Sequence, residues 1–238
     1  MKERLQKIMS RSGLCSRRAA ELWLTQGRVR VNGIVACLGD QADVLTDAIE
    51  VDGQPLSLPT EPVYLMLHKP RGYVTTLSDE KGRRTAAELV ADCGRRVFPV
   101  GRLDMDSEGL LLFTDDGALM QALTHPRGEV NKVYRVTVRG ALEGAAERLA
   151  AMDKLDGEPI RPAQVRETER SGGQAVLEVT IHQGKNRQIR RMCGAAGLQV
   201  LRLVRIREHT LALGDLPTGQ WRYLTEAEIS ALKGSETT

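Results

Sequence analysis

The feature that most constrains the fold is a pair of apolar runs, residues 98–103 and 110–114, separated by a polar loop. Turn residues bound both runs, which predicts two buried strands. Gly101 and Gly109 bracket the loop, and a loop held at both ends by buried strands is a rigid mount for a reactive side chain. Asp104 is the candidate for that side chain. The alternative is a surface turn, in which Asp, Ser and Gly are common in any case.

Composition is that of an ordinary globular protein, and we expect a cytoplasmic one. The 238 residues allow one large domain or a small one plus a medium one; 41% are hydrophobic and 3% aromatic. Few aromatics argue against base binding by rows of stacked rings. No apolar run approaches ~18 residues and none follows the basic N-terminus, so we expect neither a membrane span nor a signal peptide. The cysteines lack metal-binding spacing, and we expect free thiols without a metal or disulfide at Cys15, Cys37, Cys93 and Cys193.

Charge is distributed unevenly along the chain, although the formal net charge is only +3. Residues 1–30 hold eight Lys or Arg and two acids, residues 31–62 hold six acids and no base, and residues 185–207 are basic again. Two separated basic clusters predict a polyanionic partner bound at two places. The alternative is scattered, solvated charge.

The N-terminal stretch begins with two predicted helices. Apolar residues at helical spacing indicate a first helix that Gly13 ends, and Ser16 is placed to cap a second one that Gly27 closes. Arg17 and Arg18 lie in the first turn of the second helix, where they oppose the helix macrodipole. Because they are poor for helix stability there, a binding role becomes more plausible for them.

A hairpin and a proline-rich connector follow. Residues 28–31 and 34–37 alternate as strands around an Asn-Gly turn, and residues 48–51 predict a further strand. The prolines of residues 55–62 form a short, stiff connector, so we place a domain boundary near residue 60. The predicted organisation is a module over 1–58, a linker over 59–62 and a second domain over 63–238.

The second domain is predicted to mix short strands with intervening helices, an α+β arrangement. No Gly-rich loop follows a strand, so a dinucleotide or ATP site is unsupported. Periodicity places strands near 63–68, 132–138, 165 and 176–181, and helices near 85–90, 116–124 and 142–152.

The last motif is the basic run at residues 184–193. Read as a helix, it packs an apolar stripe on the sheet and turns Arg187, Arg190 and Arg191 towards a cleft. A solvated amphipathic helix is the alternative. No acid lies within 185–207, which favours contact with phosphate or carboxylate groups.

The N-terminal module resembles the αL-type RNA-binding module shared by a ribosomal small-subunit protein and some tRNA synthetases. The resemblance implies that Arg17 and Arg18 bind RNA phosphates, supported by Arg4, Lys7 and Arg28. Such contacts position an RNA rather than read its sequence. The matching residues are Arg4–Lys7, Ser12–Ala20, Gly27–Gly33 and Gly39-Asp40.

The whole chain resembles the RsuA/RluB/RluE/RluF family of ribosomal RNA pseudouridine synthases. This implies a small αL-type domain followed by a mixed, mainly antiparallel catalytic domain. The family motifs are Gly101–Asp104, Lys132–Tyr134 and Gly184–Met192. Within the family, the segments Gly13–Arg18, Arg96–Pro99 and Asn186–Cys193 are most similar to the RluF type. The segment Leu123–Arg127 is more similar to the RluB type.

The family reaction breaks the bond between uracil and ribose, turns the base and rejoins it through a ring carbon, without a cofactor. By resemblance, Asp104 is the carboxylate beside the sugar, acting either as nucleophile or as base. Tyr134 packs its ring on the uracil, although a core strand residue is the plain reading. Since an arginine would keep Asp104 ionised, we expect that partner to be Arg190, then Arg187, then Lys185.

The remaining expectations concern RNA. Arg102 fills the gap left by the extruded nucleotide, and Lys185, Arg187 and Arg191 contact RNA. The RluF and RluB likeness implies large-subunit ribosomal RNA near the peptidyl-transferase region, with a tRNA anticodon as an additional substrate of the RluF type. A monomer suffices. Asp104, Tyr134 and at least one of Arg187 or Arg190 should converge in one basic cleft.

Three alternatives remain open. The first is a small-subunit ribosomal RNA target, and the second is a non-catalytic RNA-binding assembly factor. The third is a metal-dependent transferase site built from Asp104, Asp106, Asp115 and Asp116.

Overall fold

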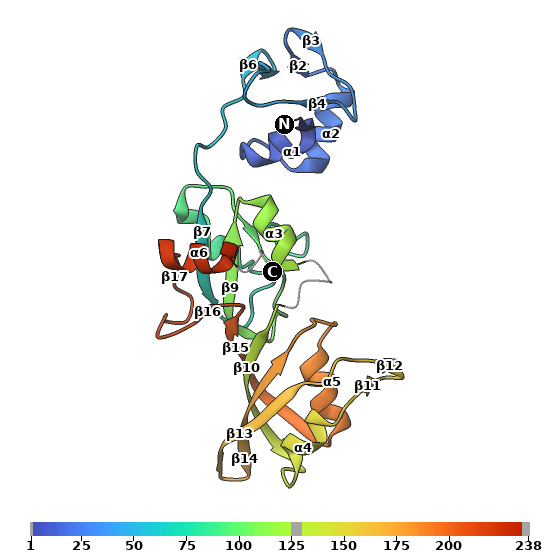
Figure 1. Ribbon diagram of the computed structural model, residues 1–238, viewed down its shortest axis with the longest axis vertical. Coiled ribbons are helices and arrows are strands. Elements are labelled where there is room, and N and C mark those ends of the chain that lie inside the picture. Colours follow the sequence, from blue (N-terminus) through green and yellow to red (C-terminus); the bar gives the residue numbers. More distant parts are fainter. Residues whose placement is uncertain (1, 125–129, 235–238) are drawn as a thin grey trace. The chain divides into compact units, whose positions relative to one another are not determined.

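The computed structural model describes residues 2–124 and 130–234 of the chain (Figure 1). It divides into two compact units, Met1–Val63 with Asp115–Gly117, and Tyr64–Thr114 with Ala118–Thr238. The motif at Leu123–Arg127 that indicates the RluB type reaches outside the described residues. No helix within the described ranges is long and apolar enough to cross a membrane.

The small unit has the helix, helix, hairpin order that the sequence predicts. Ser16 Oγ accepts the Ala19 N–H at 3.1 Å and so caps α2. Arg4 lies in β1, before the first helix, because Glu3 and Arg4 pair with residues 41–42. The elements are β1 (Glu3–Arg4), α1 (Leu5–Arg11), α2 (Arg17–Thr25), β2 (Val29–Val31), β3 (Ile34–Val35), β4 (Gln41–Ala42), β5 (Ile49–Val51) and β6 (Gln54–Pro55).

A mixed sheet forms the large unit, with the order β13-β14-β10-β15-β9-β7-β17. Its pairs are antiparallel except for β15 with β9, so the expected α+β class with a mainly antiparallel sheet is confirmed. Its strands are β7 (Tyr64–Lys69), β8 (Phe98–Pro99), β9 (Glu108–Thr114), β10 (Lys132–Gly140), β13 (Gln164–Ser171), β14 (Gln174–Ile181), β15 (Leu198–Glu208), β16 (Leu211–Ala212) and β17 (Trp221–Tyr223).

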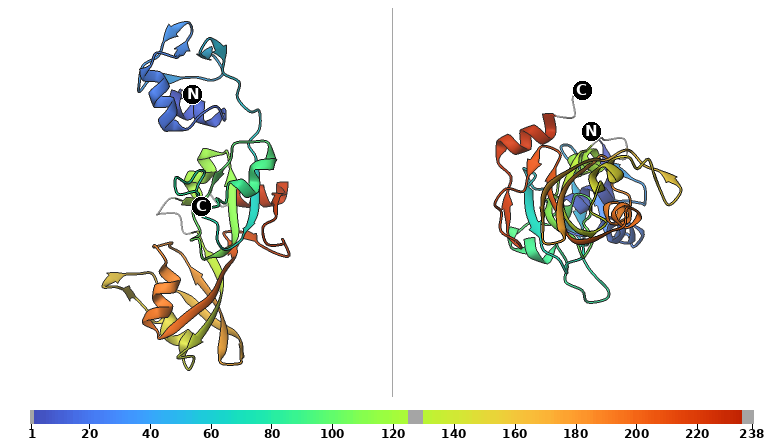
Figure 2. Two further views of the ribbon diagram at one scale, coloured as in Figure 1. Left: turned by 180° about the vertical axis from the view of Figure 1, so that it is seen from behind. Right: turned by 90° about the horizontal axis from the view of Figure 1, so that it is seen from below.

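Helices and a small hairpin complete this unit. Figure 2 shows how strongly the long yellow and orange strands curl. The helix predicted over 142–152 begins later because Leu142 N–H turns back to the Gly140 carbonyl. These elements are η1 (Glu88–Cys93), a 3₁₀ helix, α3 (Gly117–Thr124), α4 (Ala145–Ala150), β11 (Lys154–Leu155), β12 (Glu158–Pro159), α5 (Gln188–Ala195) and α6 (Glu226–Gly234).

The parallel pair of β9 and β15 forms the centre of the sheet. Its register sets Glu108 beside Val204 and Gly109 beside Arg205. Gly109 has φ +113°, and a Cβ atom at this position would lie 2.3 Å from the Arg205 carbonyl oxygen. Only glycine permits this approach, so the residue places the start of β9 directly against β15.

The predicted strand pair around the polar loop is present but shifted. The first strand is only Phe98–Pro99, because Gly101 adopts φ +73° and turns the chain away. The second begins at Glu108 instead of residue 110, since Glu108 and Gly109 already pair with β15. The loop with Asp104 therefore runs directly into the central strand.

Candidate active site

The backbone that carries Asp104 is held from two sides. Thr75 Oγ1 donates to the Leu103 carbonyl at 2.7 Å and accepts the Leu103 N–H at 3.2 Å. Lys69, at the end of β7, donates from Nζ to the carbonyls of Asp104 at 3.1 Å and Ser107 at 2.9 Å. The loop is thus fixed immediately before Asp104 and beneath it.

Lys69 is fully buried, and burial lowers the pKa of its ammonium group to about 8. The charges of Asp104, Asp106 and Glu108 act in the opposite direction and raise this pKa. The ammonium is therefore still mostly protonated at neutral pH, as its hydrogen bonds to carbonyls require. Lys69 was not among the residues that the sequence indicated for the site. Its position at the end of a mostly apolar strand was the available signal.

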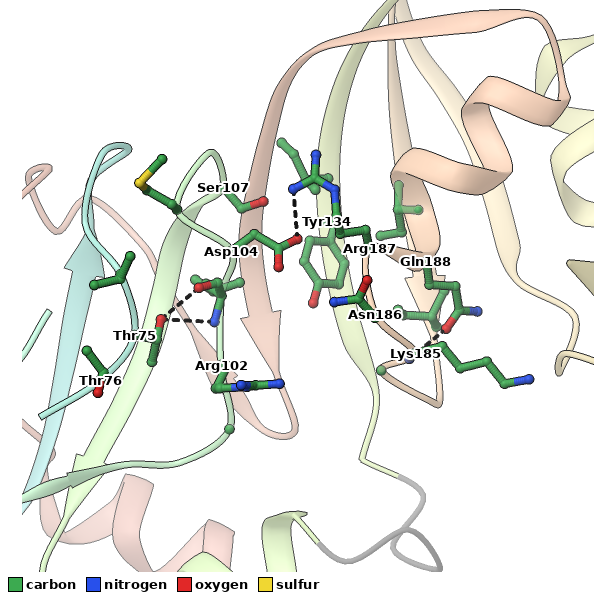
Figure 3. Close-up of a pocket in the computed structure, with 18 of the residues that line it drawn as sticks. Thr75, Thr76, Arg102, Asp104, Ser107, Tyr134, Lys185, Asn186, Arg187 and Gln188 are labelled. Carbon is green, nitrogen blue, oxygen red and sulfur yellow. Dashed lines mark hydrogen bonds and ion pairs between the residues drawn. The ribbon is translucent and has the colours of Figure 1, made fainter. Parts of the chain in front are cut away.

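Asp104 and Tyr134 line one open hollow of about 700 Å³. In Figure 3 the Asp104 carboxyl faces the Tyr134 ring and the Arg187 guanidinium. Arg187 Nη1 lies 3.6 Å from Asp104 Oδ2. The predicted convergence of carboxylate, tyrosine and arginine is present, with Arg187 as the arginine. A volume of this size accommodates a nucleotide.

Arg187 owes its direction to an unusual backbone. The residue precedes α5 with φ +49°, the left-handed region that non-glycine residues rarely adopt. Its guanidinium donates two hydrogen bonds to Asp106, at 2.9 and 2.8 Å. Chiefly through these bonds, Arg187 lowers the pKa of the Asp106 carboxyl, and Asp106 raises the pKa of Arg187. Asp106 therefore holds Arg187 next to Asp104.

Arg190 lies behind the loop. Its Nη2 donates to the Asp106 carbonyl at 2.7 Å, and its Nε lies 3.3 Å from Asp106 Oδ2. Burial lowers the pKa of Arg190, with the side chain 14% exposed. The sequence ranked Arg190 first as partner of Asp104 and Arg187 second. The structure differs because α5 begins after residue 187, which leaves Arg187 at the hollow and turns Arg190 under the loop.

Tyr134 forms a wall of the hollow from β10 and is 8% exposed. Burial raises the pKa of its hydroxyl, while the positive charge of Arg205 acts in the opposite direction. Arg205 is itself fully buried, donates from Nε to the Leu110 carbonyl at 2.8 Å and lies 3.1 Å from Glu208. The tyrosine therefore both packs in the strand and faces the hollow as a neutral phenol.

The other basic residues of this unit separate into two groups. Arg102 lines the hollow and forms no ion pair with any described residue. Lys185 also lines it, but its ammonium donates to the Pro159 carbonyl at 2.8 Å and points away in Figure 3. Arg191 is paired with Asp156 instead. The expectation that three arginines face one cleft therefore holds for Arg187 alone.

Of the residues of the small unit that are predicted to contact RNA, some form ion pairs within the protein and others do not. Arg4, Arg17 and Arg18 are exposed, and none forms an ion pair with a described residue. Lys7 is paired with Glu3 at 2.7 Å. Arg28 donates to both oxygens of Asp52, at 2.9 and 2.5 Å, and lies over the Trp23 ring at 4.4 Å.

Two of the aspartates expected for the metal-site alternative form hydrogen bonds within the protein. Asp106 accepts from Arg187, and Asp115 Oδ1 accepts the Val63 N–H at 2.8 Å. Among the residues that the structure describes, no three His, Cys, Asp or Glu side chains are grouped so that they could hold a metal ion.

Comparison with known proteins yields consistent matches. The model of the family described as RNA pseudouridylate synthase matches residues 63–195, and that of the S4 domain matches residues 3–41. An uncharacterized RNA pseudouridine synthase of Aquifex aeolicus is 39% identical over 98% of this chain and 94% of its own length.

Two further relatives have more specific descriptions. The ribosomal large subunit pseudouridine synthase B of Bacillus subtilis is 38% identical, over 97% of this chain and 96% of its own. A crystal structure described as pseudouridylate synthase superposes with a TM-score of 0.66 at 31% identity, covering 96% of this chain and 99% of the other. The S4 match lies within the range where the sequence predicts the RNA-binding module.

Proposed function

This chain belongs to the RsuA/RluB family of RNA pseudouridine synthases, and we propose that it isomerises a uridine of large-subunit ribosomal RNA. It is an isomerase with an RNA substrate. The observation that carries the proposed site is the single hollow shared by Asp104, Tyr134 and Arg187. The large-subunit target rests on the relatives that are described as ribosomal large subunit synthases.

Asp104 is the reacting carboxylate in this proposal. Positive charge that develops on the ribose as the base departs is stabilised by a nearby carboxylate, as in glycoside cleavage. The Arg187 guanidinium lies 3.6 Å from this carboxylate and places a positive charge beside it. Lys69 and Thr75 fix the backbone and hence the direction of the carboxylate. Attack on the anomeric carbon and removal of a sugar proton both fit this geometry.

Tyr134 supplies the surface for the uracil ring, and Arg102 fills the space that the extruded nucleotide leaves. Taking a base out of a stem costs a few kcal/mol. Phosphate contacts from the exposed Arg4, Arg17 and Arg18 offset this cost without reading sequence. Specificity then depends on RNA shape and on unpaired bases.

The test is tritium release from ribosomal RNA transcripts that carry uridine labelled at carbon 5. We expect release from large-subunit RNA by the wild type and none by Asp104→Asn, which keeps the shape of the side chain but removes its charge. Asp153→Asn, at an exposed position directly before β11, is the matched control and should remain active. No wild-type release from either ribosomal RNA would refute the enzyme's proposed substrate, and release by Asp104→Asn would refute the role of this residue.

Mapping pseudouridines in RNA from a deletion strain identifies the target. A lost site in large-subunit RNA supports the proposal, and a further lost site in a tRNA anticodon adds the second substrate. A site lost only from small-subunit RNA would replace the proposal with the alternative target. Unchanged pseudouridine in all RNA would favour an assembly factor.

A further inference from the structure

A second hollow of about 480 Å³ lies beside the first, and the two share a wall. Asp79 and Arg83 line both of them. They lie in the loop over residues 75–84, which is part of the connection between β7 and the 3₁₀ helix η1. Both residues therefore also line the hollow that holds Asp104, and neither was singled out in the sequence.

The wall is a rigid ion pair. Arg83 donates from Nη2 to Asp79 Oδ1 at 2.6 Å and from Nε to the same carboxylate at 3.1 and 3.2 Å. Asp79 Oδ2 also accepts the Lys81 and Arg83 N–H groups at 3.0 and 2.9 Å. The Asp79 carboxylate thus accepts hydrogen bonds both from the loop backbone and from the Arg83 guanidinium.

The pair presents its positive side outwards. The Asp79 side chain is 7% exposed, whereas that of Arg83 is 48% exposed. Arg83 Nη1 has no partner among the described contacts, so a planar donor edge faces the solvent in a fixed direction. An arginine held in this way loses little side-chain entropy when it binds an anion.

The loop is joined to the backbone that carries Asp104. Val74 N–H donates to the Arg84 carbonyl at 3.0 Å, and Ala86 N–H donates to the Val74 carbonyl at 2.9 Å, which closes the base of the loop. The next residue, Thr75, is bound to Leu103 immediately before Asp104. Arg83 and Asp104 therefore belong to one connected framework.

The second hollow has a lining that suits a base. Leu77, Ala87 and Ala91 supply apolar surface, and Ser78 and Glu88 supply polar groups. A nucleic acid that places one base in the hollow of Asp104 and the next base in the second hollow would pass Arg83 with the phosphate that joins the two nucleotides.

We propose that the second hollow binds a nucleotide adjacent to the target uridine and that Arg83 binds the phosphate between the two nucleotides. This inference rests on the proposed function. Arg83 is then a substrate-binding residue, and Asp79 is a positioning residue that acts through it. The enzyme then binds the RNA chain on one side of the reacting nucleotide through this contact, independently of the S4 domain. Arginine suits this role because its guanidinium matches the phosphate oxygens in geometry.

The first experiment compares Arg83→Ala with Lys81→Ala in the full chain. Lys81 has the same charge and lies in the same loop but lines neither hollow. Tritium release from ribosomal RNA transcripts should show kcat/KM lowered about 10- to 100-fold for Arg83→Ala, mainly through KM. The slope of log affinity against log salt should become shallower by about 0.7. Lys81→Ala should change kcat/KM less than about 2-fold.

The Asp79→Asn variant tests whether Asp79 acts by holding Arg83 in place or only through its own negative charge. Removing a carboxylate near RNA should tighten binding if only net charge matters. If Arg83 must be held in place, Asp79→Asn should instead raise KM with little change in kcat. Equal effects of Arg83→Ala and Lys81→Ala, or tighter binding by Asp79→Asn, would overturn the proposal.

A neutral methylphosphonate placed in turn on each side of the mapped uridine locates the contact. At one of the two positions it should weaken the wild type by about 10-fold or more and leave Arg83→Ala unaffected. Additive losses at both positions would refute the contact. A wild type that releases no tritium from ribosomal RNA refutes the proposed function instead, so the two failures are distinguishable.

Discussion

Gly109→Ala tests the close approach of β9 to β15. The new Cβ would lie 2.3 Å from the carbonyl oxygen and 2.5 Å from the nitrogen of Arg205, both backbone atoms that cannot rotate away. The backbone conformation, φ +113°, costs an alanine about 1–3 kcal/mol. Displacing a packed strand costs about 1–3 kcal/mol more. We therefore expect the free energy of unfolding to fall by about 2–6 kcal/mol.

Gly172→Ala is the matched control. This glycine also has a positive φ, +58°, but a Cβ atom there would meet nothing within 4 Å. Only the left-handed conformation is penalised, which costs about 1–2 kcal/mol. The difference between the two variants therefore reports chiefly the backbone clash.

The assay is urea unfolding followed by tryptophan fluorescence. Trp221 lies in β17 of the large unit and Trp23 in the small one, so a Trp23→Phe background reports the large unit alone. Gly109→Ala should unfold at clearly lower urea than Gly172→Ala with a similar m-value. It should also lose activity, because the strand after Asp104 is displaced. Equal midpoints for the two variants would refute the steric argument.

Two other predictions follow from the charged groups. Lys69 has its pKa lowered by burial to about 8, so between pH 8 and 10.5 the unfolded chain binds the extra proton and the wild type gains stability from this group as pH rises. Activity should fall over the same pH range, since the neutral amine has one hydrogen-bond donor fewer for the Asp104 loop. Lys69→Met should lose the stability gain and at least about 10-fold in kcat. A wild type whose activity and stability do not change between pH 8 and 10.5 would contradict this. Arg28→Ala should leave RNA affinity within about 2-fold, because the Asp52 carboxylate paired with it is 51% exposed and would repel a phosphate there. Arg17→Ala should weaken affinity and make the salt dependence shallower by about 0.7 in filter binding. Equal losses would reject the distinction.

Much of this protein is determined by local sequence. The Ser16 cap, the Asn-Gly turn and the alternating strands specify the small unit because turn and capping chemistry acts within a few residues. The run of apolar residues at 110–114 likewise predicts a buried strand, and the order of motifs identifies the family. The position of Asp104 in a loop between strands was accessible in the same way.

Only the tertiary structure decided what surrounds Asp104. Lys69 and Thr75 lie 35 and 28 residues from the carbonyls that they bind, and Arg187 lies more than 80 residues away. Contacts over such separations depend on strand register and on where a helix begins, which local patterns do not specify. The start of α5 after residue 187 therefore decided that Arg187, and not Arg190, meets the carboxylate.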